Sequence, residues 1–311
     1  MNMHLGIGAA ADTVVNYILD HFMPFLDGIA MVIGFVTDTI KAALTGVPPL
    51  AAVAVIVLLA LWRVGWKFAL FAVAALFVIL GMDLWERTME TLSLVLSATV
   101  IAIVVGVPLG IAMARSEAVA LFVRPVLDLM QTMPAFVYLI PAAMFFGLGA
   151  VPGTIATVIF AMPPVVRLTN LGLRQVNSEF IEAGLAFGCT PGQLLMKVQL
   201  PNALPSIMAG INQSLMLSLS MVVIASMIAV GGLGLMVLRG IGRLDMGLAT
   251  VGGIGIVILA ILLDRVTQAM GRHDRRSMRW HQRGPIGLAT RLLQRQPAHP
   301  AAPATSATAQ A

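Results

Sequence analysis

Charged residues and cysteines are scarce in this sequence. Lysine, arginine, aspartate and glutamate together make up 11% of its 311 residues, whereas soluble domains carry about 25%. Hydrophobic residues make up 59%, and the mean hydropathy is +0.95. The single cysteine, Cys189, excludes an intrachain disulfide. This composition excludes an ordinary soluble domain and indicates an all-α polytopic membrane protein.

Motifs for several chemistries are also missing. There is no G-x-x-x-x-G-K-[ST] run, so the chain is not expected to bind ATP phosphates itself. No histidine or cysteine cluster has metal-ligand spacing, so we expect no metal and no cofactor in this chain. The net charge of +5 does not indicate a nucleic-acid partner, because most cations lie in short loops and in the C-terminal tail. The N-terminus lacks a basic n-region, so the first span is expected to act as the targeting signal.

Long apolar segments predict about seven transmembrane helices. A span needs about 20 residues at a rise of 1.5 Å each. The first two segments are short and predict a tight hairpin around "RVGWK", with Arg63 and Lys67 reaching the lipid headgroups. We place the spans at 48–63, 66–82, 89–114, 131–149, 152–168, 206–230 and 250–268.

Residues 12–44 repeat apolar side chains in alternating steps of four and three, which indicates a helical face. Four aspartates interrupt this face, so the segment is a poor spanning helix. It predicts an amphipathic extracytoplasmic helix at the membrane interface, broken near Pro24. A soluble helix packed on a partner is the alternative.

The distribution of cations predicts the orientation. If residues 182–201 lie in the cytoplasm, 15 of the 19 lysines and arginines fall on that side, as the positive-inside rule favours. The four on the outside are Lys41, Arg87, Arg239 and Arg243. Seven spans then place the N-terminus outside and the C-terminus in the cytoplasm. The basic part of the tail is expected to touch anionic headgroups, and its last 15 residues are expected to be disordered.

A polar insert, "EAGLAFGCTPGQLLMKVQLP", stands between two apolar spans at residues 182–201. Residues 179–187 predict a helix that Gly188 ends. Thr190, Pro191 and Gln193 then form a capping-box pattern that starts a second helix, expected to run to about Gln199. Pro201 and Pro205 are expected to redirect the chain. Ile181, Leu185 and Leu194 can pack inward, which leaves Glu182 and the turn facing a partner. On spacing alone, a purely structural loop is the alternative.

The insert resembles the signature loop of membrane subunits of ATP-driven, binding-protein-dependent importers. The family's E-A-(A/G)-x3-G-x9-(I/V)-x-L-P spacing falls on Glu182, Ala183, Gly184, Gly188, Val198, Leu200 and Pro201. Alanine is usual at position 184 and isoleucine at 198, so both departures are small. The segments "METLSLVLSATVIAIVVGVPLGIAMARS", "DLMQTMPAFVYLIPAAMFFGLGAVPG" and 212–265 are similar to permeases of glycine betaine/proline betaine importers. The similarity covers roughly residues 85–270, together with the preceding hairpin.

This resemblance implies a five-helix type I importer permease core in the bacterial inner membrane. It implies a homodimer with two ATPase subunits, which would hold ATP and Mg²⁺, and with an extracytoplasmic binding protein. It also implies that the loop docks on the ATPase and couples its motion to the spans. The docking residues implied are Glu182, Ala183, Gly184, Gly188, Thr190, Pro191, Leu200 and Pro201.

Polar residues in span 206–230 predict a translocation path. At 100° per residue, Asn212, Gln213, Met216 and Ser220 fall on one arc. An amide facing lipid is costly, so these side chains should face protein or water. Interhelical hydrogen bonding is the alternative, and Ser214 and Ser218 on the opposite side suit it.

The loop 231–247 carries Arg239, Arg243 and Asp245 on the outside. The resemblance implies an outer gate or a dock for the binding protein here. A structural loop with an Arg–Asp pair is the alternative.

We therefore divide the chain into an N-terminal segment (1–46), a transmembrane hairpin (47–83), a permease core (84–270) that contains the coupling loop (177–204), and a basic, then disordered, cytoplasmic tail (271–311). We expect a non-catalytic permease subunit of a betaine or related quaternary-amine importer. The alternatives are the same architecture serving choline, carnitine or an amino acid, and a secondary transporter or channel that acts alone.

Overall fold

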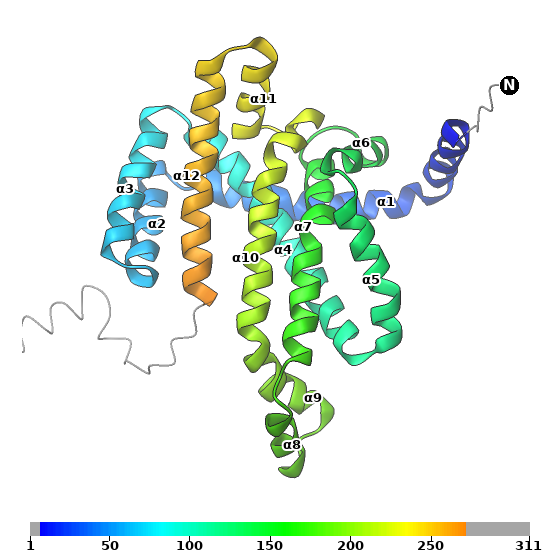
Figure 1. Ribbon diagram of the computed structural model, residues 1–311. Helices are drawn as coiled ribbons and strands as arrows, with labels where there is room; N and C mark the ends of the chain where they lie inside the picture. Colours follow the sequence, from blue (N-terminus) through cyan, green and yellow to red (C-terminus); the bar gives the residue numbers. More distant parts are fainter. Residues whose placement is uncertain (1–6, 272–311) are drawn as a thin grey trace, which may run out of the picture. The chain divides into compact units, whose positions relative to one another are not determined.

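The computed structural model describes residues 7–271, and these form helices with no strand among them. The expectations for the basic and disordered tail fall on residues 272–311, outside the described part. Helices α7, α10 and α12 lie side by side, whereas α8 and α9 stand beyond the ends of α7 and α10 (Figure 1). The α-helices are α1 (Ile7–Thr45), α2 (Pro49–Arg63), α3 (Trp66–Gly81), α4 (Trp85–Arg115), α5 (Glu117–Thr132), α6 (Leu139–Phe146), α7 (Ala150–Arg174), α8 (Ser178–Ala186), α9 (Pro191–Leu194), α10 (Leu200–Ala225), α11 (Leu233–Arg243) and α12 (Met246–Gly271).

Helices α4, α7 and α10 form the centre of the described fold. Helix α4 runs parallel to α7, since Gly106 faces Val165 and Gly110 faces Thr169 further along both helices. A Cβ atom on Gly110 would lie 2.6 Å from the Thr169 Cβ, so glycine permits this close approach. Small residues at helix contacts are typical of membrane bundles. Helix α10 runs antiparallel to α7.

A second apolar cluster joins the hairpin of α2 and α3 to α11 and α12. Its most buried members include Ala60, Leu76, Ile79 and Leu233. Both hairpin helices are shorter than a full span, as predicted, and they meet at Gly65, whose φ is +130°. The predicted hairpin at residues 48–82 is therefore confirmed as a pair of short apolar helices.

The predicted span 131–149 is wrong as a single straight helix. The chain forms α5, a short 3-10 helix η1 (Ala135–Tyr138) and α6, and the two parts are bent by 108°. Met133 has the extended ψ of 136° that a following proline favours, and Pro134 has no N–H with which to continue α5. Three of the remaining predicted spans, 89–114, 152–168 and 250–268, fall inside the long helices α4, α7 and α12, whereas the predicted span 206–230 runs past the end of α10 at Ala225.

Helix α1 is continuous, so the predicted break near Pro24 does not occur. The helix contacts α4, α6 and α7. Lys41 forms an ion pair with Glu90 near the start of α4, at 3.0 Å, and Gly34 lies beside Val151 near the start of α7. Helix α1 thus reaches the N-terminal ends of two parallel helices, and in Figure 1 it runs across them rather than along them.

The prolines at 201 and 205 do not redirect the chain. Helix α9 passes through a π-helical turn η2 (Leu195–Gln199) into α10, and the whole segment Pro191–Ile228 is one apolar run. Leu200 N–H donates to the Leu195 carbonyl, five residues earlier. The wider turn accommodates Pro201, which cannot donate a hydrogen bond to the residue four positions before it.

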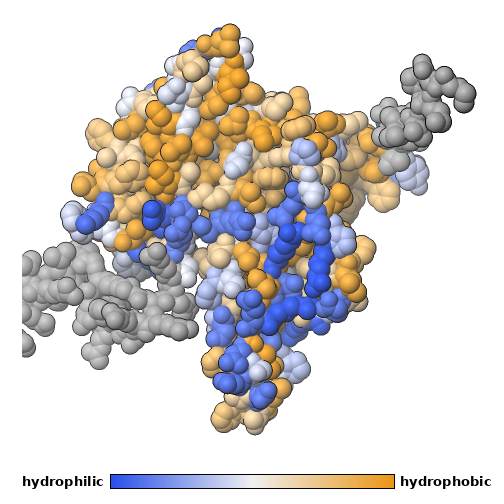
Figure 2. Space-filling model, in the orientation of Figure 1, coloured by the Kyte–Doolittle hydropathy of each residue, from blue (hydrophilic) through white to orange (hydrophobic). Residues whose placement is uncertain are grey.

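Five of the described helices are long and apolar enough to cross a membrane, and the bent pair α5–α6 makes a sixth. They include the segment Val15–Thr45 of α1, by length and composition alone. Figure 2 shows hydrophobic surface over the helical bundle, whereas hydrophilic residues gather toward the end that carries α8 and α9. This distribution is that of a bundle buried in lipid with one polar end.

Candidate docking and translocation sites

The insert between α7 and α10 folds as the predicted helix–turn–helix. Asn177 caps α8 by accepting a hydrogen bond from the Glu179 N–H at 3.0 Å. Gly188 has φ +77°, the left-handed conformation that ends a helix. The capping box also forms, because Thr190 N–H donates to Gln193 Oε1 at 3.0 Å and Gln193 N–H donates to Thr190 Oγ1 at 3.4 Å. Both ends of the turn are thus fixed by local hydrogen bonds.

Helix α8 packs on α9 through Gly184, the buried residue of this helix. A Cβ at this position would lie 2.7 Å from Leu194 Cδ1. Ile181 and Leu194 are half-buried, as predicted, but the prediction for Leu185 is wrong, since its side chain is 54% exposed. With Gly184 set against α9, Leu185 is turned by 100° to the outer side of a helix only nine residues long.

The loop presents an apolar surface that the sequence did not single out. We define the docking tip as the exposed side chains Phe180, Leu185, Phe187 and Met196, of which Phe187 is 89% exposed. Glu182, Ala183, Gly188, Thr190 and Pro191 are also exposed, whereas Leu200 is half-buried. Large exposed apolar side chains on a polar end of a protein mark an interaction surface. The sequence did hold a signal for this surface, namely the phenylalanines at positions 180 and 187 within a polar insert.

Two arginines attach the segment around this loop to α4 and α5. Arg115, the last residue of α4, donates from Nη2 to the Pro191 carbonyl at 3.0 Å. Arg174, the last residue of α7, donates to the Met113 carbonyl at 2.8 Å and to Glu117 Oε2 at 2.7 Å. Arg167 and Asp128 form a further ion pair between α7 and α5.

The Arg174 hydrogen bond and charge lower the pKa of Glu117 below its usual 4.5, with a smaller contribution from Arg124. A lowered carboxyl pKa favours the folded state above the unfolded pKa, and this contribution is lost as pH falls through the folded pKa. The Glu117 side chain is exposed, so the pair adds little stability and serves chiefly to position the helix ends.

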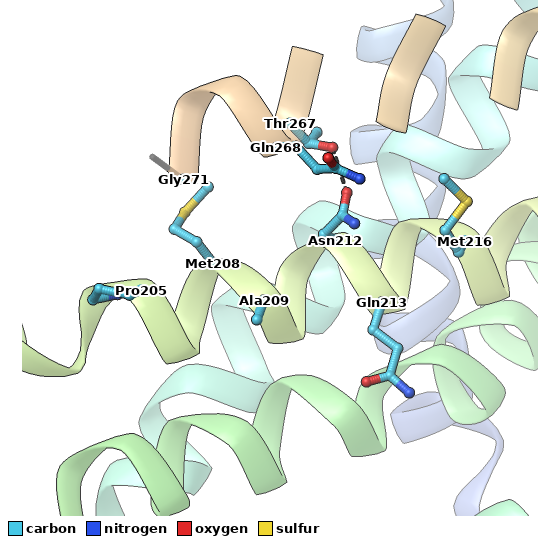
Figure 3. Close-up of a pocket in the computed structure, with 9 residues that line it drawn as sticks. All are labelled: Pro205, Met208, Ala209, Asn212, Gln213, Met216, Thr267, Gln268 and Gly271. Atoms are coloured by element: carbon cyan, nitrogen blue, oxygen red, sulfur yellow. Dashed lines mark hydrogen bonds between the residues drawn. The ribbon is translucent and has the colours of Figure 1, made fainter. Parts of the chain in front are cut away.

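A hollow of about 530 Å³ opens between α10 and α12. Three of the four predicted path residues line it, namely Asn212, Gln213 and Met216, whereas Ser220 lies outside it. Figure 3 shows Asn212 directed toward Thr267 and Gln268 of α12, with Gln213 directed away from them and Met208 and Met216 on either side. The remaining lining residues are Pro205, Ala209 and Gly271.

Asn212 joins the two helices that border this hollow. Its Nδ2 donates to Asp264 Oδ1 at 3.2 Å, and its Oδ1 accepts from Thr267 Oγ1 at 2.6 Å. Gln268 Nε2 donates to the same Asp264 oxygen at 2.7 Å. Interhelical bonding, the alternative at the sequence level, is therefore formed by Asn212.

Gln213 and Ser220 occupy a different face of α10 and are exposed. Gln213 makes no side-chain hydrogen bond among the described residues, and Ser220 bonds to the Met216 carbonyl of its own helix at 3.1 Å. The expectation that Ser214 and Ser218 bond to neighbouring helices is wrong for residues 7–271. Both are buried, and their hydroxyls have no partner there. Gly210, one turn before Ser214 on α10, packs against Val165 and Leu168 of α7.

The outer-loop residues lie at the end of α11 and in the turn before α12. Arg239, Arg243 and Asp245 are all exposed. No Arg–Asp pair forms here within the described residues; Asp245 Oδ1 instead accepts from the Leu248 N–H at 3.0 Å and caps α12. Ile241, Leu244 and Met246 beside them are 60–88% exposed.

A bundle of long apolar helices with a polar end is that of an integral membrane protein. The chain belongs to the family of binding-protein-dependent transport system inner membrane components, whose family model matches residues 106–279.

Relatives of known function extend this likeness over most of the chain. The chain is 54% identical to the glycine betaine/proline betaine transport system permease protein ProW of Escherichia coli (strain K12), over 89% of this chain and 79% of that one. It is 53% identical to the glycine betaine/carnitine transport permease protein GbuB of Listeria monocytogenes, over 82% of this chain and 92% of the other.

The fold is also that of a solved importer. An inward-facing structure of the MetNI methionine ABC transporter matches with a TM-score of 0.55 at 21% identity, and the match covers 59% of this chain and 92% of that chain. The likeness shows the type I importer permease fold. The all-α polytopic fold with a type I permease core, predicted from sequence, is thus confirmed, and the chain is a multi-pass membrane protein.

Proposed function

We propose that this chain is the permease subunit of an ATP-driven, binding-protein-dependent importer for glycine betaine, proline betaine or a related quaternary amine. The observation that carries the proposal is the docking tip. Four apolar side chains stand exposed on a capped helix–turn–helix beyond the polar end of the bundle. The betaine permeases among the relatives support the choice of solute.

The proposed partner at this tip is an ATPase subunit, which would hold ATP and Mg²⁺. The loop is suited to receive a push because α9 continues through the π-turn into α10, so displacement of the tip acts directly on a bundle helix. Glu182 would lie at the rim of the docked surface and fix its orientation by charge. This chain would hydrolyse nothing.

Two copies of the chain would flank a shared path, with Gln213 as the polar group most open to it. The exposed face of α10 runs through Ala209, Gln213 and Ser220. A second copy would cover this face and leave its amides toward water rather than lipid. Arg239 and Arg243 at the opposite end of the bundle would meet the binding protein outside the cell.

Other relatives are permeases for carnitine and choline, so these solutes are the alternatives. The carnitine permease OpuCB of Listeria monocytogenes is 37% identical over 59% of this chain, and the choline permease OpuBB of Bacillus subtilis is 32% identical over 60%. Both values are well below those of the betaine permeases, which favours betaine.

Reconstitution tests the proposal. The chain is placed in proteoliposomes with the cognate ATPase and binding protein, and uptake of radiolabelled glycine betaine is measured with ATP or with a non-hydrolysable analogue. We expect uptake only with ATP, the ATPase and the binding protein together. Uptake by the chain alone would instead indicate a secondary transporter or channel, and ATP-driven uptake of choline but not betaine would reassign the solute.

A further inference from the structure

Helix α4 is hydrogen-bonded to the chain before the docking tip and within it. Arg115, at its C-terminal end, reaches the Pro191 carbonyl at the start of α9. The Met113 carbonyl, two residues earlier on α4, accepts from Arg174 at the end of α7. Among the described residues, Arg115 makes the only side-chain hydrogen bond that joins residues 177–199 to a helix other than α7 and α10.

The Arg115 contact is not explained by helix electrostatics. Pro191 is the first residue of a helix that continues into α10, and a cation at a helix N-terminus opposes the helix dipole. The Pro191 carbonyl also already accepts a hydrogen bond from Leu195 N–H. The positive charge of Arg115 is favourable at the C-terminus of α4. Its hydrogen bond to the Pro191 carbonyl has a different effect, which is to hold α9 in place.

The other end of α4 is tied to the turn between α10 and α11. Leu233 N–H donates to Thr91 Oγ1 at 2.9 Å, and this hydroxyl is buried. Gly231 approaches Glu90 so closely that a Cβ would lie 2.8 Å from Glu90 Oε2. Thr91 and Arg115 lie on one helix, about 36 Å apart at 1.5 Å per residue.

We infer that α4 is a strut that carries motion of the docking tip to the α10–α11 turn at the opposite end of the bundle. Arg115 is its positioning residue at the tip, and Thr91 is its positioning residue at the turn. Displacement of α9 would then open or close the far end through α4 as well as through α10. The inference rests on the proposed ATPase docking and adds the second route by which that motion crosses the membrane.

The test measures solute imported per ATP hydrolysed by the full complex in proteoliposomes. For Arg115→Ala we expect this ratio to fall at least about fivefold, the low end of typical coupling between sites, while ATPase co-purification and basal hydrolysis persist. Arg115→Lys keeps both the charge at the end of α4 and an N–H donor for the Pro191 carbonyl, so we expect it to retain most of the ratio. Arg63→Ala, which removes an exposed arginine from the distant α2–α3 turn, should leave the ratio unchanged.

Thr91 supplies the second arm of the test. Thr91→Val keeps the shape but removes the acceptor for Leu233 N–H, and we expect the same fall in the ratio; Thr91→Ser keeps the acceptor and should restore it. An unchanged ratio in Arg115→Ala would overturn the strut, and so would an Arg115→Ala complex that loses its ATPase. Failure of the unsubstituted chain to bind any ATPase would refute the proposed function instead.

Discussion

Two neighbouring amides of α10 have different surroundings. Asn212 bonds to Asp264 and Thr267 of α12, whereas Gln213 points away from that network and is exposed. Helical geometry sets adjacent side chains 100° apart, so one can tie helices together while the other faces an opening. The two residues, paired in the sequence-level prediction, therefore need separate tests.

Gln213→Leu should abolish or strongly reduce solute uptake while sparing the fold. The substitution removes no hydrogen bond within residues 7–271 and replaces the polar group that we place in the path. Uptake by the reconstituted complex and thermal unfolding in detergent measure the two effects. Full uptake by this variant would refute the role of Gln213 in the path.

Asn212→Leu is the matched comparison. It removes the hydrogen bonds of Asn212 to Asp264 and Thr267, and because the site is half-buried and Gln268 still donates to Asp264, we expect a cost of about 1 kcal/mol. A lowered unfolding temperature in Asn212→Leu but not in Gln213→Leu is the expected pattern. Equal destabilisation of both variants would contradict the assignment of Asn212 to helix contacts and of Gln213 to the path.

Gly184 lies where the packing of α8 on α9 leaves little room for a side chain. The related loops usually carry alanine here, but in this chain the Leu194 side chain would lie 2.7 Å from an added Cβ. Since the obstacle is the flexible end of a leucine, the departure from alanine is small in structural terms. Its effect is to let α8 lie directly on α9.

At the scale of elements, the docking loop was predictable because its signals are local. The cap at Thr190 and the left-handed Gly188 each depend on residues within a few positions, and each formed as expected from the capping-box and C-cap patterns. The Asn177 cap of α8 was not predicted, although its signal is equally local. Most of the apolar segments were located for the same reason, but the segment 131–149 is bent and 206–230 runs past the end of α10. What the sequence did not reveal depends on partners distant in the chain, such as the Arg115 and Arg174 contacts.

The errors have a common physical origin. Prolines at 24, 201 and 205 were expected to break or redirect helices, yet each lies within helical structure. A membrane helix can lose one backbone hydrogen bond when neighbouring packing or a wider π-turn compensates. At Pro134 no such compensation operates, and the chain bends there by 108°.

Charge reversal on α8 tests the docking loop as a unit. For Glu182→Lys we expect loss of ATPase co-purification and of ATP-driven uptake, because a rim charge in the proposed interface becomes repulsive. The side chain is exposed and makes no described ion pair, so membrane insertion and thermal stability should not change. Glu179→Gln on the same helix, which removes a charge without placing a cation at the helix N-terminus, is the control, with uptake close to that of the unsubstituted chain. Normal uptake by Glu182→Lys would contradict the docking role.

At the scale of the whole molecule, the proposed orientation can be read from the chain's one cysteine. Cys189 lies half-buried in the turn between α8 and α9, next to the docking tip. If this end is cytoplasmic, a membrane-impermeant maleimide should label Cys189 in inside-out vesicles and not in right-side-out ones.

The matched control places a new cysteine at the other end. In a Cys189→Ser background, Leu244→Cys, at a position 88% exposed before α12, should show the reverse pattern. Labelling of Cys189 in right-side-out vesicles would show that the orientation is opposite to the one proposed. The proposed ATPase could then not bind at the docking tip. Helix α1, which reaches the N-terminal ends of α4 and α7, would then lie on the cytoplasmic side.

The contact between α7 and α10 has a mechanical consequence. Four hydroxyls in the helices of this bundle, on Thr154, Thr169, Ser214 and Ser218, are buried without a hydrogen-bond partner among residues 7–271. Thr169 lies against Gly110 of α4, and the end of the α10 segment is joined to α7 by the Gly149 N–H, which donates to the Ile228 carbonyl at 2.9 Å. No side-chain hydrogen bond joins α7 to α10 within residues 7–271, so close packing holds most of this contact and separation would open a void. Sliding would break only the Gly149–Ile228 bond, so we expect α10 to move along α7 more readily than away from it when the segment before α10 is displaced.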